Sequence, residues 1–249
     1  MIRSVFVRCR SAIRHTRRGI AVAAGCGLTA ALTTAGLGAG SATAAPAVLG
    51  LDVSSHQHSI NWSTVRAKGA RFAYIKATEG VGFVNPDFAS QYDGSYQVGM
   101  IRGAYHFALP NVSSGAAQAR YFVANGGGWS ADGRTLPGVL DIEPNPYGAE
   151  CYRLSRSAMV SWIASFTNTY HARTSRWPVI YTNSGFWARC TGNYGGFGNR
   201  DPLWMVGTGT LPGWGFYSFA QYAFAGTFPG DQDIFNGSSS RLSRLAVGP

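Results

Sequence analysis

Short apolar runs alternate with helical segments along most of this 249-residue chain. A strand, a helix and a further strand form a parallel β/α unit, so this alternation predicts a parallel sheet. Eight runs predict a closed α/β barrel in a single domain. The expected strands are 48–54, 72–78, 99–108, 138–143, 178–182, 203–207, 216–222 and 234–235. The expected helices are 62–68, 86–98, 114–124 and 154–171.

Helical patterning becomes scarce after Trp187, where glycine, asparagine and aromatic residues dominate. The last three strands are therefore expected to be connected by loops or hairpins. The sequence shows no internal repeat and no low-complexity tail. We expect one domain over residues 46–249, present as a monomer.

The first 45 residues have the organisation of a secretory signal peptide. Six arginines and no acidic residue precede an apolar run rich in alanine, glycine and threonine, and the small-residue sequence Ala42-Thr43-Ala44-Ala45 follows. This order is typical of export signals. A membrane anchor is the alternative, but the glycine and threonine content and the cleavage-type sequence favour export. We expect residues 1–45 to be removed and the remaining domain to be extracellular, with no membrane attachment.

The charge of the chain depends strongly on this leader. The full sequence has 21 Lys and Arg against 11 Asp and Glu, a formal net charge of +10. Six basic residues belong to the leader, which leaves 15 against 11, or +4. A mildly basic secreted protein is attracted to anionic polymers such as cell walls. Lys68 and Lys76 are the only lysines and no Lys/Arg stripe is present, so we expect no nucleic-acid partner.

Two cysteines, Cys151 and Cys190, remain after removal of the leader. An even number of cysteines in an exported chain predicts that they form a disulfide bond. Closing a loop of this length stabilises a protein by roughly 3–4 kcal/mol in the chain-entropy model. Together with four histidines, these cysteines offer no metal-ligand spacing. We predict that the domain binds no metal and no cofactor.

Asp141 and Glu143 are separated by one residue at the end of the apolar run 138–140. Residues two apart in a strand point to the same face, roughly 6–7 Å from one another. Two carboxylates held this close in a poorly solvated cleft cannot both ionise easily, so one pKa rises and a general acid becomes available near neutral pH. The alternative is two acids that cap the following loop, because D-x-E is a common pattern.

Acidic residues concentrate at the ends of the predicted strands. Functional residues of parallel barrels gather at the carboxyl ends of the strands. At least five of the 11 acidic residues lie there, which predicts a pocket lined with carboxylates. The residues at these ends include Asp52, Glu79, Tyr105, Asp141, Glu143, Tyr181, Gln221, Asp231 and Asp233. His106, between two aromatic residues, is expected to be a core residue instead.

Short motifs over residues 49–237 resemble glycoside hydrolase family 25, the secreted muramidases often called lysozymes. Each motif is weak alone, but their order and spacing together are specific. They include Gly50-Leu51-Asp52-Val53-Ser54-Ser55-His56-Gln57, Tyr74-Ile75-Lys76-Ala77-Thr78-Glu79-Gly80, Leu140-Asp141-Ile142-Glu143 and Asp231-Gln232-Asp233-Ile234-Phe235-Asn236-Gly237. The resemblance implies a flattened TIM-like barrel of (β/α)5(β)3 type. It also implies cleavage of the β-1,4 bond between N-acetylmuramic acid and N-acetylglucosamine in peptidoglycan glycan strands.

The resemblance further implies roles for individual residues. Glu143 matches the general acid, and Asp141 matches a partner that assists the substrate's 2-acetamido group in attacking the anomeric carbon. Direct attack by water with inversion is the alternative. Asp52 and Asp231 match two further acids of the cleft, and Asp231 fits the register better than Asp233. The expected substrate-binding residues are Glu79, Tyr105, Tyr181, Trp204 and Gln221, whose aromatic members can stack on sugar rings.

The chain departs from the family pattern at two places. Asn61 stands where aspartate is usual, and we expect it to cap the helix that follows. The sixth strand, 203–207, lacks the alanine and nearby tyrosine often seen there. Two other functions are alternatives: a peptidoglycan-binding protein without activity on the same scaffold, and a chitinase-like hydrolase. The intact set of acids disfavours the first, and the absence of a full D-x-x-D-x-D-x-E signature disfavours the second.

Overall fold

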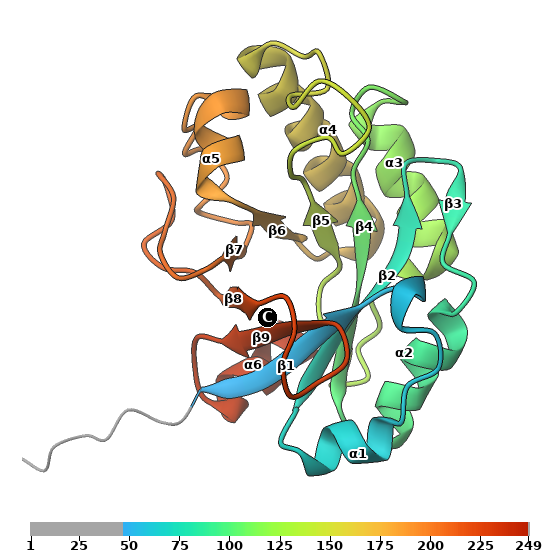
Figure 1. Cartoon of the computed structure of the whole chain (residues 1–249). Helices are drawn as coiled ribbons and strands as arrows, with labels where there is room; N and C mark the ends of the chain where they lie inside the picture. Colours follow the sequence, from blue (N-terminus) through green and yellow to red (C-terminus); the bar gives the residue numbers. More distant parts are fainter. Residues whose placement is uncertain (1–46, 249) are drawn as a thin grey trace, which may run out of the picture. The chain divides into compact units, whose positions relative to one another are not determined.

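The computed structural model describes residues 47–248, so the expected signal peptide lies outside the described residues. The strands form one sheet in the order β1-β9-β8-β7-β6-β5-β4-β2-β3, and pairing of β1 with β2 closes it into a barrel (Figure 1). The short strand β3 pairs only with β2 and lies outside the closed ring. The strands are β1 (Val48–Val53), β2 (Phe72–Glu79), β3 (Phe83–Val84), β4 (Ile101–Phe107), β5 (Val139–Asp141), β6 (Val179–Thr182), β7 (Leu203–Val206), β8 (Phe219–Ala223) and β9 (Asp231–Phe235). The predicted α/β barrel is confirmed.

The direction of strand pairing changes at the last strand. All neighbours from β1 through β2, β4, β5, β6 and β7 to β8 are parallel, whereas β9 is antiparallel to both β8 and β1. The parallel strands therefore end at one mouth of the barrel, and β9 begins there. Asp231, the first residue of β9, pairs with Asp52 near the end of β1. This reversal brings the start of the ninth strand to the rim on which the other strands end.

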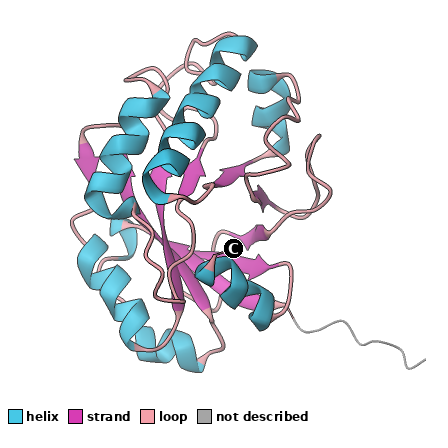
Figure 2. Ribbon diagram, turned by 180° about the vertical axis from the view of Figure 1, so that it is seen from behind, coloured by secondary structure: helices cyan, strands magenta, loops and turns pink. Residues whose placement is uncertain are grey.

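Helices pack against the outside of the barrel (Figure 2). The α2 helix contacts β2 and β4, and α3 packs against α4. Asn61 caps α1 as expected, because its Oδ1 accepts a hydrogen bond from the N–H of Thr64 at 3.0 Å. Within residues 47–248, no helix has the length and apolar character that a membrane crossing requires. The helices are α1 (Trp62–Ala67), α2 (Phe88–Gln97), α3 (Gly115–Phe122), α4 (Arg156–Thr174), α5 (Ser184–Phe186) and α6 (Ser239–Val247).

The C-terminal helix α6 is not predicted from the sequence. It buries only Leu242 and Ala246, which is too few apolar positions to reveal a helical period. Both residues join the barrel cluster that contains Val48 and Phe235. The side chain of Ser238 accepts a hydrogen bond from the N–H of Arg241 and caps the helix. Tertiary packing and one N-terminal cap therefore stabilise a helix that its own pattern of apolar residues does not predict.

Aromatic rings fill the interior of the barrel below the mouth. The ring of Tyr74 lies 5.0 Å from that of Trp204 and 5.5 Å from that of Phe219. Gly50 and Gly103 face the rings of Phe72 and Tyr74, and a Cβ at either position would collide with them. Side chains therefore fill this part of the interior, as in other barrels of this kind.

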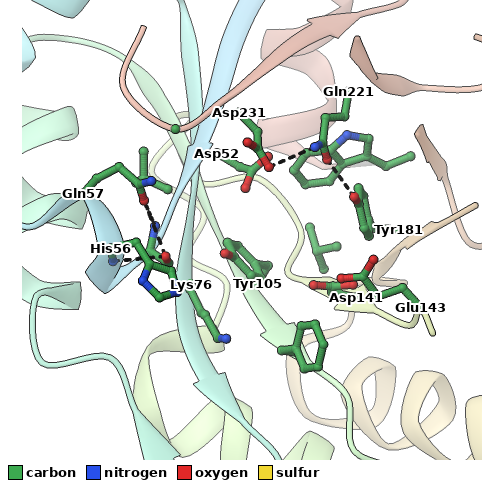
Figure 3. A pocket seen from close by; sticks show the side chains of 16 residues that line it. Asp52, His56, Gln57, Lys76, Tyr105, Asp141, Glu143, Tyr181, Gln221 and Asp231 are labelled. Carbon is green, nitrogen blue, oxygen red and sulfur yellow. Dashed lines mark hydrogen bonds between the residues drawn. The ribbon is translucent and has the colours of Figure 1, made fainter. Parts of the chain in front are cut away.

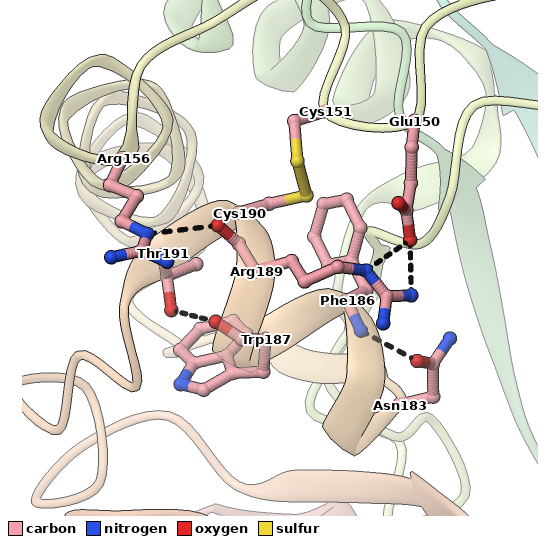
Figure 4. The surroundings of a disulfide bond; sticks show 9 residues. All are labelled: Glu150, Cys151, Arg156, Asn183, Phe186, Trp187, Arg189, Cys190 and Thr191. Carbon is pink, nitrogen blue, oxygen red and sulfur yellow. Dashed lines mark hydrogen bonds and ion pairs between the residues drawn. A yellow bond between two sulfur atoms is a disulfide. The ribbon is translucent and has the colours of Figure 1, made fainter.

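A disulfide bond joins Cys151 and Cys190, which confirms the predicted pairing (Figure 4). Cys151 lies in the loop between β5 and α4, and Cys190 lies in the helical turn η3 (Trp187–Thr191). Arg189 forms an ion pair with Glu150 beside the bond. The bond therefore fastens the loop that follows Glu143 to the segment that follows β6.

Replacing both cysteines with alanine should lower the free energy of unfolding by about 3–4 kcal/mol, because the bond closes a loop between positions 39 residues apart. Denaturant unfolding followed by tryptophan fluorescence measures this difference. A reductant should lower the midpoint of the wild type and leave that of the double variant unchanged. A wild-type midpoint that is insensitive to the reductant would contradict the expectation.

Candidate active site

A cavity of about 280 Å³ occupies the mouth of the barrel (Figure 3). Most of its lining comes from the carboxyl ends of the parallel strands and from the start of β9. The predicted site residues that line it are Asp52, Tyr105, Asp141, Glu143, Tyr181, Trp204, Gln221 and Asp231. Glu79 is not among the lining residues, and the disulfide lies outside the cavity. The structure thus brings together eight of the nine residues predicted to act on or bind substrate.

Asp141 and Glu143 share one face of the chain at the end of β5. Asp141 pairs with Phe107 on one side and Tyr181 on the other. The backbone stays extended beyond it, because the N–H of Ile142 donates to the carbonyl oxygen of Tyr181 at 3.0 Å. Ile142 packs into the core cluster beside the helices, whereas both acids line the cavity. The common face predicted from the i, i+2 spacing is therefore present, although the strand ends at Asp141.

Few neighbouring groups stabilise a negative charge on Asp141 or Glu143. Burial, followed by the charge of Glu143, raises the pKa of Asp141 well above its usual range. Burial also raises the pKa of Glu143, and the nearby Lys76 opposes that rise. Oδ1 of Asp141 is buried without a hydrogen-bond partner among residues 47–248. One of the two acids can therefore hold a proton near neutral pH.

Asp52 and Asp231 lie side by side on the opposite wall of the cavity (Figure 3). Nε2 of Gln221 donates to Oδ2 of Asp231 at 2.9 Å, and the hydroxyl of Tyr181 donates to Oε1 of Gln221 at 2.7 Å. Burial and then the charge of Asp231 raise the pKa of Asp52 well above its usual range. Burial raises the pKa of Asp231, and the hydrogen bond from Gln221 opposes this. Asp52 and Asp231 therefore form a second acidic pair, in which the amide of Gln221, held by the phenol of Tyr181, orients Asp231.

The two aspartates of β9 occupy different environments. Asp231 lines the cavity, whereas the side chain of Asp233 is completely buried and is not part of the lining. The indole Nε1 of Trp204 donates to Oδ1 of Asp233 at 3.2 Å. Of these two aspartates, only Asp231 is therefore in a position to contact a ligand in the cavity.

Glu79 lies behind Lys76 instead of facing the cavity. Its Oε2 accepts a hydrogen bond from Nζ of Lys76 at 2.6 Å, and its Oε1 accepts one from the hydroxyl of Tyr147, also at 2.6 Å. Lys76 lines the cavity, with Nζ 4.8 Å from the ring centroid of Phe107. Lys76 is not among the site residues predicted from the sequence. The available signal was a lysine inside an otherwise apolar strand, which is uncommon unless the charge has a partner.

The predicted aromatic residues contribute unequally to the accessible surface. Trp204 and Tyr181 touch the cavity but retain only 2% and 8% of their exposure, because they pack edge to face at 5.1 Å. Tyr105 is partly exposed and lies between the two acidic pairs (Figure 3). Burial and the charge of Asp52 raise the pKa of Tyr105 well above its usual range, so it stays a neutral phenol.

His106 is a buried core residue, as predicted. Its Nε2 lies 2.9 Å from the amide oxygen of Gln118, which is an acceptor, so Nε2 carries the proton. Nδ1 then accepts from the hydroxyl of Thr78 at 2.8 Å. Burial lowers the pKa of His106 to about 4, which keeps the ring neutral. Among residues 47–248, no group of three or more histidine, cysteine or acidic side chains is arranged to hold a metal ion.

A parallel barrel with two carboxylate pairs around its mouth has the architecture of a glycoside-cleaving barrel enzyme. The family model described as glycosyl hydrolases family 25 matches residues 51–231. The chain therefore belongs to glycosyl hydrolases family 25, and it is a glycoside hydrolase.

Similar proteins include Lysozyme M1 of Streptomyces globisporus, which is 50% identical over 227 residues that cover 85% of this chain and 77% of that protein. N,O-diacetylmuramidase of Chalaropsis is 46% identical over 210 residues, which cover 81% of this chain and 100% of that protein. Among solved structures, the muramidase from Acremonium alcalophilum is 57% identical with a TM-score of 0.79. That similarity covers 81% of this chain and 100% of the other. Sequence and fold thus agree on the family.

Proposed function

We propose that this protein is a secreted muramidase that hydrolyses the β-1,4 bond between N-acetylmuramic acid and N-acetylglucosamine in peptidoglycan. The observation that supports this most strongly is the pair Asp141 and Glu143 on one wall of the cavity, facing Asp52 and Asp231 on the other. The names lysozyme and muramidase carried by relatives of 46% to 57% identity support the substrate class.

In the proposed reaction, Glu143 gives its proton to the bridging glycosidic oxygen as the bond from that oxygen to the anomeric carbon breaks. The 2-acetamido oxygen of the muramic acid residue attacks the same carbon and forms an oxazolinium ring. Asp141 accepts a hydrogen bond from the acetamido N–H and balances the positive charge that develops there. Asp141 lines the cavity, which suits its carboxylate to that contact.

The second half of the reaction reverses the proton transfer. Glu143, now a carboxylate, takes a proton from a water molecule whose oxygen attacks the anomeric carbon and opens the ring. One water is consumed, and both acids return to their starting states. Asp52 and Asp231 supply negative potential beside the sugar ring, which carries positive charge in the oxocarbenium-like transition states.

Turnover should fall on the alkaline side of the pH profile, because Glu143 must keep its proton until the glycosidic oxygen takes it. Lys76 lowers the pKa of Glu143, so Lys76→Gln should move this alkaline limb to higher pH. The measurement is kcat against pH on soluble glycan fragments, for the wild type and the variant. A wild-type profile that is flat from about pH 4 to about pH 9 would argue against an acid at this position.

Digestion of purified peptidoglycan tests the proposed function. Borohydride converts each new reducing end into an alditol, and mass spectrometry then identifies the sugar. Reduced N-acetylmuramic acid is expected. Reduced N-acetylglucosamine would assign cleavage to the other glycosidic bond. If the protein binds the glycan without cleaving it, it is a peptidoglycan-binding protein and not a muramidase.

Export through residues 1–45 is part of the same proposal. Expression in a secreting host should give an extracellular protein that begins near residue 46. N-terminal sequencing of that protein measures the cleavage site directly. Retention of an uncleaved leader in the membrane fraction would favour a membrane anchor instead.

A further inference from the structure

A third acid stands behind the wall formed by Asp52 and Asp231. Asp233 is 0% exposed, and its strand pairs with β1 so that Gly50 is its direct neighbour and Asp52 lies two residues further along. Gly50 has no side chain, and the ring of Phe72 fills the space where one would lie. Asp52 and Asp233 are therefore diagonal neighbours on one face of the paired strands, within reach of each other.

One oxygen of each carboxyl group lacks a donor. Oδ2 of Asp52 and Oδ2 of Asp233 are both buried, and neither has a hydrogen-bond partner within residues 47–248. The indole of Trp204 already satisfies the other oxygen of Asp233. Two carboxylates cannot share a hydrogen bond, because both are acceptors only; a proton on one of them resolves this.

The surroundings decide which acid keeps that proton. The ionisable groups around Asp233 are Asp52 on β1, Asp231 on β9, Tyr74 on β2 and Tyr181 on β6. None of the ion pairs within residues 47–248 includes Asp52, Asp231 or Asp233. Asp52 is partly exposed and borders the cavity, whereas Asp233 has no access to water. The neutral form is therefore favoured at Asp233 and the charged form at Asp52.

We infer that Asp233 is a positioning residue: it keeps its proton at neutral pH and donates it in a hydrogen bond from Oδ2 to Oδ2 of Asp52. This bond turns the remaining oxygen of Asp52 toward the cavity and stabilises its negative charge. The hydrogen bond lowers the pKa of Asp52, against the larger effect of burial. Asp52 then supplies the charge assigned to it in the proposed function, on which this inference rests.

Two substitutions at one position separate this role from others. In Asp233→Asn, the amide oxygen can accept from Trp204 and the amide N–H can donate to Asp52, so most turnover should survive. In Asp233→Leu, the donor is lost while the volume is roughly kept. Turnover should then fall by about 10- to 100-fold, the scale of one hydrogen bond to a charged group. The acid limb of the pH profile should also move to higher pH, because Asp52 becomes harder to ionise.

Infrared spectroscopy on the folded proteins reports the proton without reference to activity. The wild type at pH 7 should show the C=O stretch of a buried, protonated carboxylic acid. Glu143 contributes a similar band, which Glu143→Gln removes. The band that remains should be lost in Asp233→Asn and retained in Asp231→Asn. Thermal unfolding of each variant checks that the comparison is made on folded protein.

Three results would overturn the inference. One is a loss of turnover in Asp233→Asn as large as that in Asp231→Asn, which would show that Asp233 acts as a charged carboxylate. The second is full activity with an unchanged pH profile in a folded Asp233→Leu variant. The third is an infrared spectrum in which Asp233→Asn removes no protonated-acid band of the wild type. If the wild type fails to cut peptidoglycan, the proposed function fails, and the infrared comparison still tests the protonation of Asp233.

Discussion

Glu143→Gln should lower turnover of peptidoglycan by at least ~100-fold, the usual scale for loss of general acid catalysis. Glutamine has nearly the same shape as glutamic acid but has no proton of suitable acidity to give to the leaving oxygen. Glu143 is only partly buried and accepts no hydrogen bond from another side chain within residues 47–248, so the fold should be unaffected. The measurement is the rate of release of reducing ends at saturating substrate.

Glu150→Gln is the matched control for this variant. Glu150 lies in the same loop after β5 and pairs with Arg189 away from the cavity. It should retain wild-type turnover, since an exposed ion pair contributes little. Equal rates for Glu143→Gln and the wild type would show that Glu143 is not the general acid.

Asp141→Asn should lower kcat by about 100-fold while changing KM little, because its charge acts mainly as the acetamido group becomes positive in the transition state. Asparagine keeps the shape and one acceptor but loses the negative charge. Asp132→Asn is the control: Asp132 forms an ion pair with Arg102 and does not line the cavity. A large rise in KM with unchanged kcat would show that Asp141 only holds the substrate.

The parallel strands and their acidic ends were predictable because burial of both sheet faces leaves long apolar runs in the sequence. The shared face of Asp141 and Glu143 follows from the period of two in an extended chain. The role of β9 was harder to predict. Its acids lie at the start of the strand, and only its antiparallel pairing with β1 brings Asp231 beside Asp52. Strand direction is set by tertiary pairing, which local pattern does not encode.

Glu79 shows a second limit of sequence reasoning. Its place at the end of β2 predicts a cavity residue, and the backbone does bring it to the rim. Lys76, three residues earlier, and Tyr147, from a distant loop, both bind its carboxylate. A charged side chain binds whichever partner the fold places beside it. A short motif does not reveal a partner that is 68 residues away in the sequence. The distinction between Asp231 and Asp233 likewise depends on the indole of Trp204, which comes from β7.

Glycan cleavage in this cavity requires a side chain at position 143 that remains un-ionised where ordinary glutamates have lost their proton. Carbon-13 NMR of the Glu143 carboxyl, assigned by comparison with Glu143→Gln and titrated in the free enzyme, measures this directly. An apparent pKa clearly above the usual glutamate value of about 4.3 is expected, because burial disfavours the charged form. A titration at or below that value would contradict the assignment of Glu143 as the proton donor.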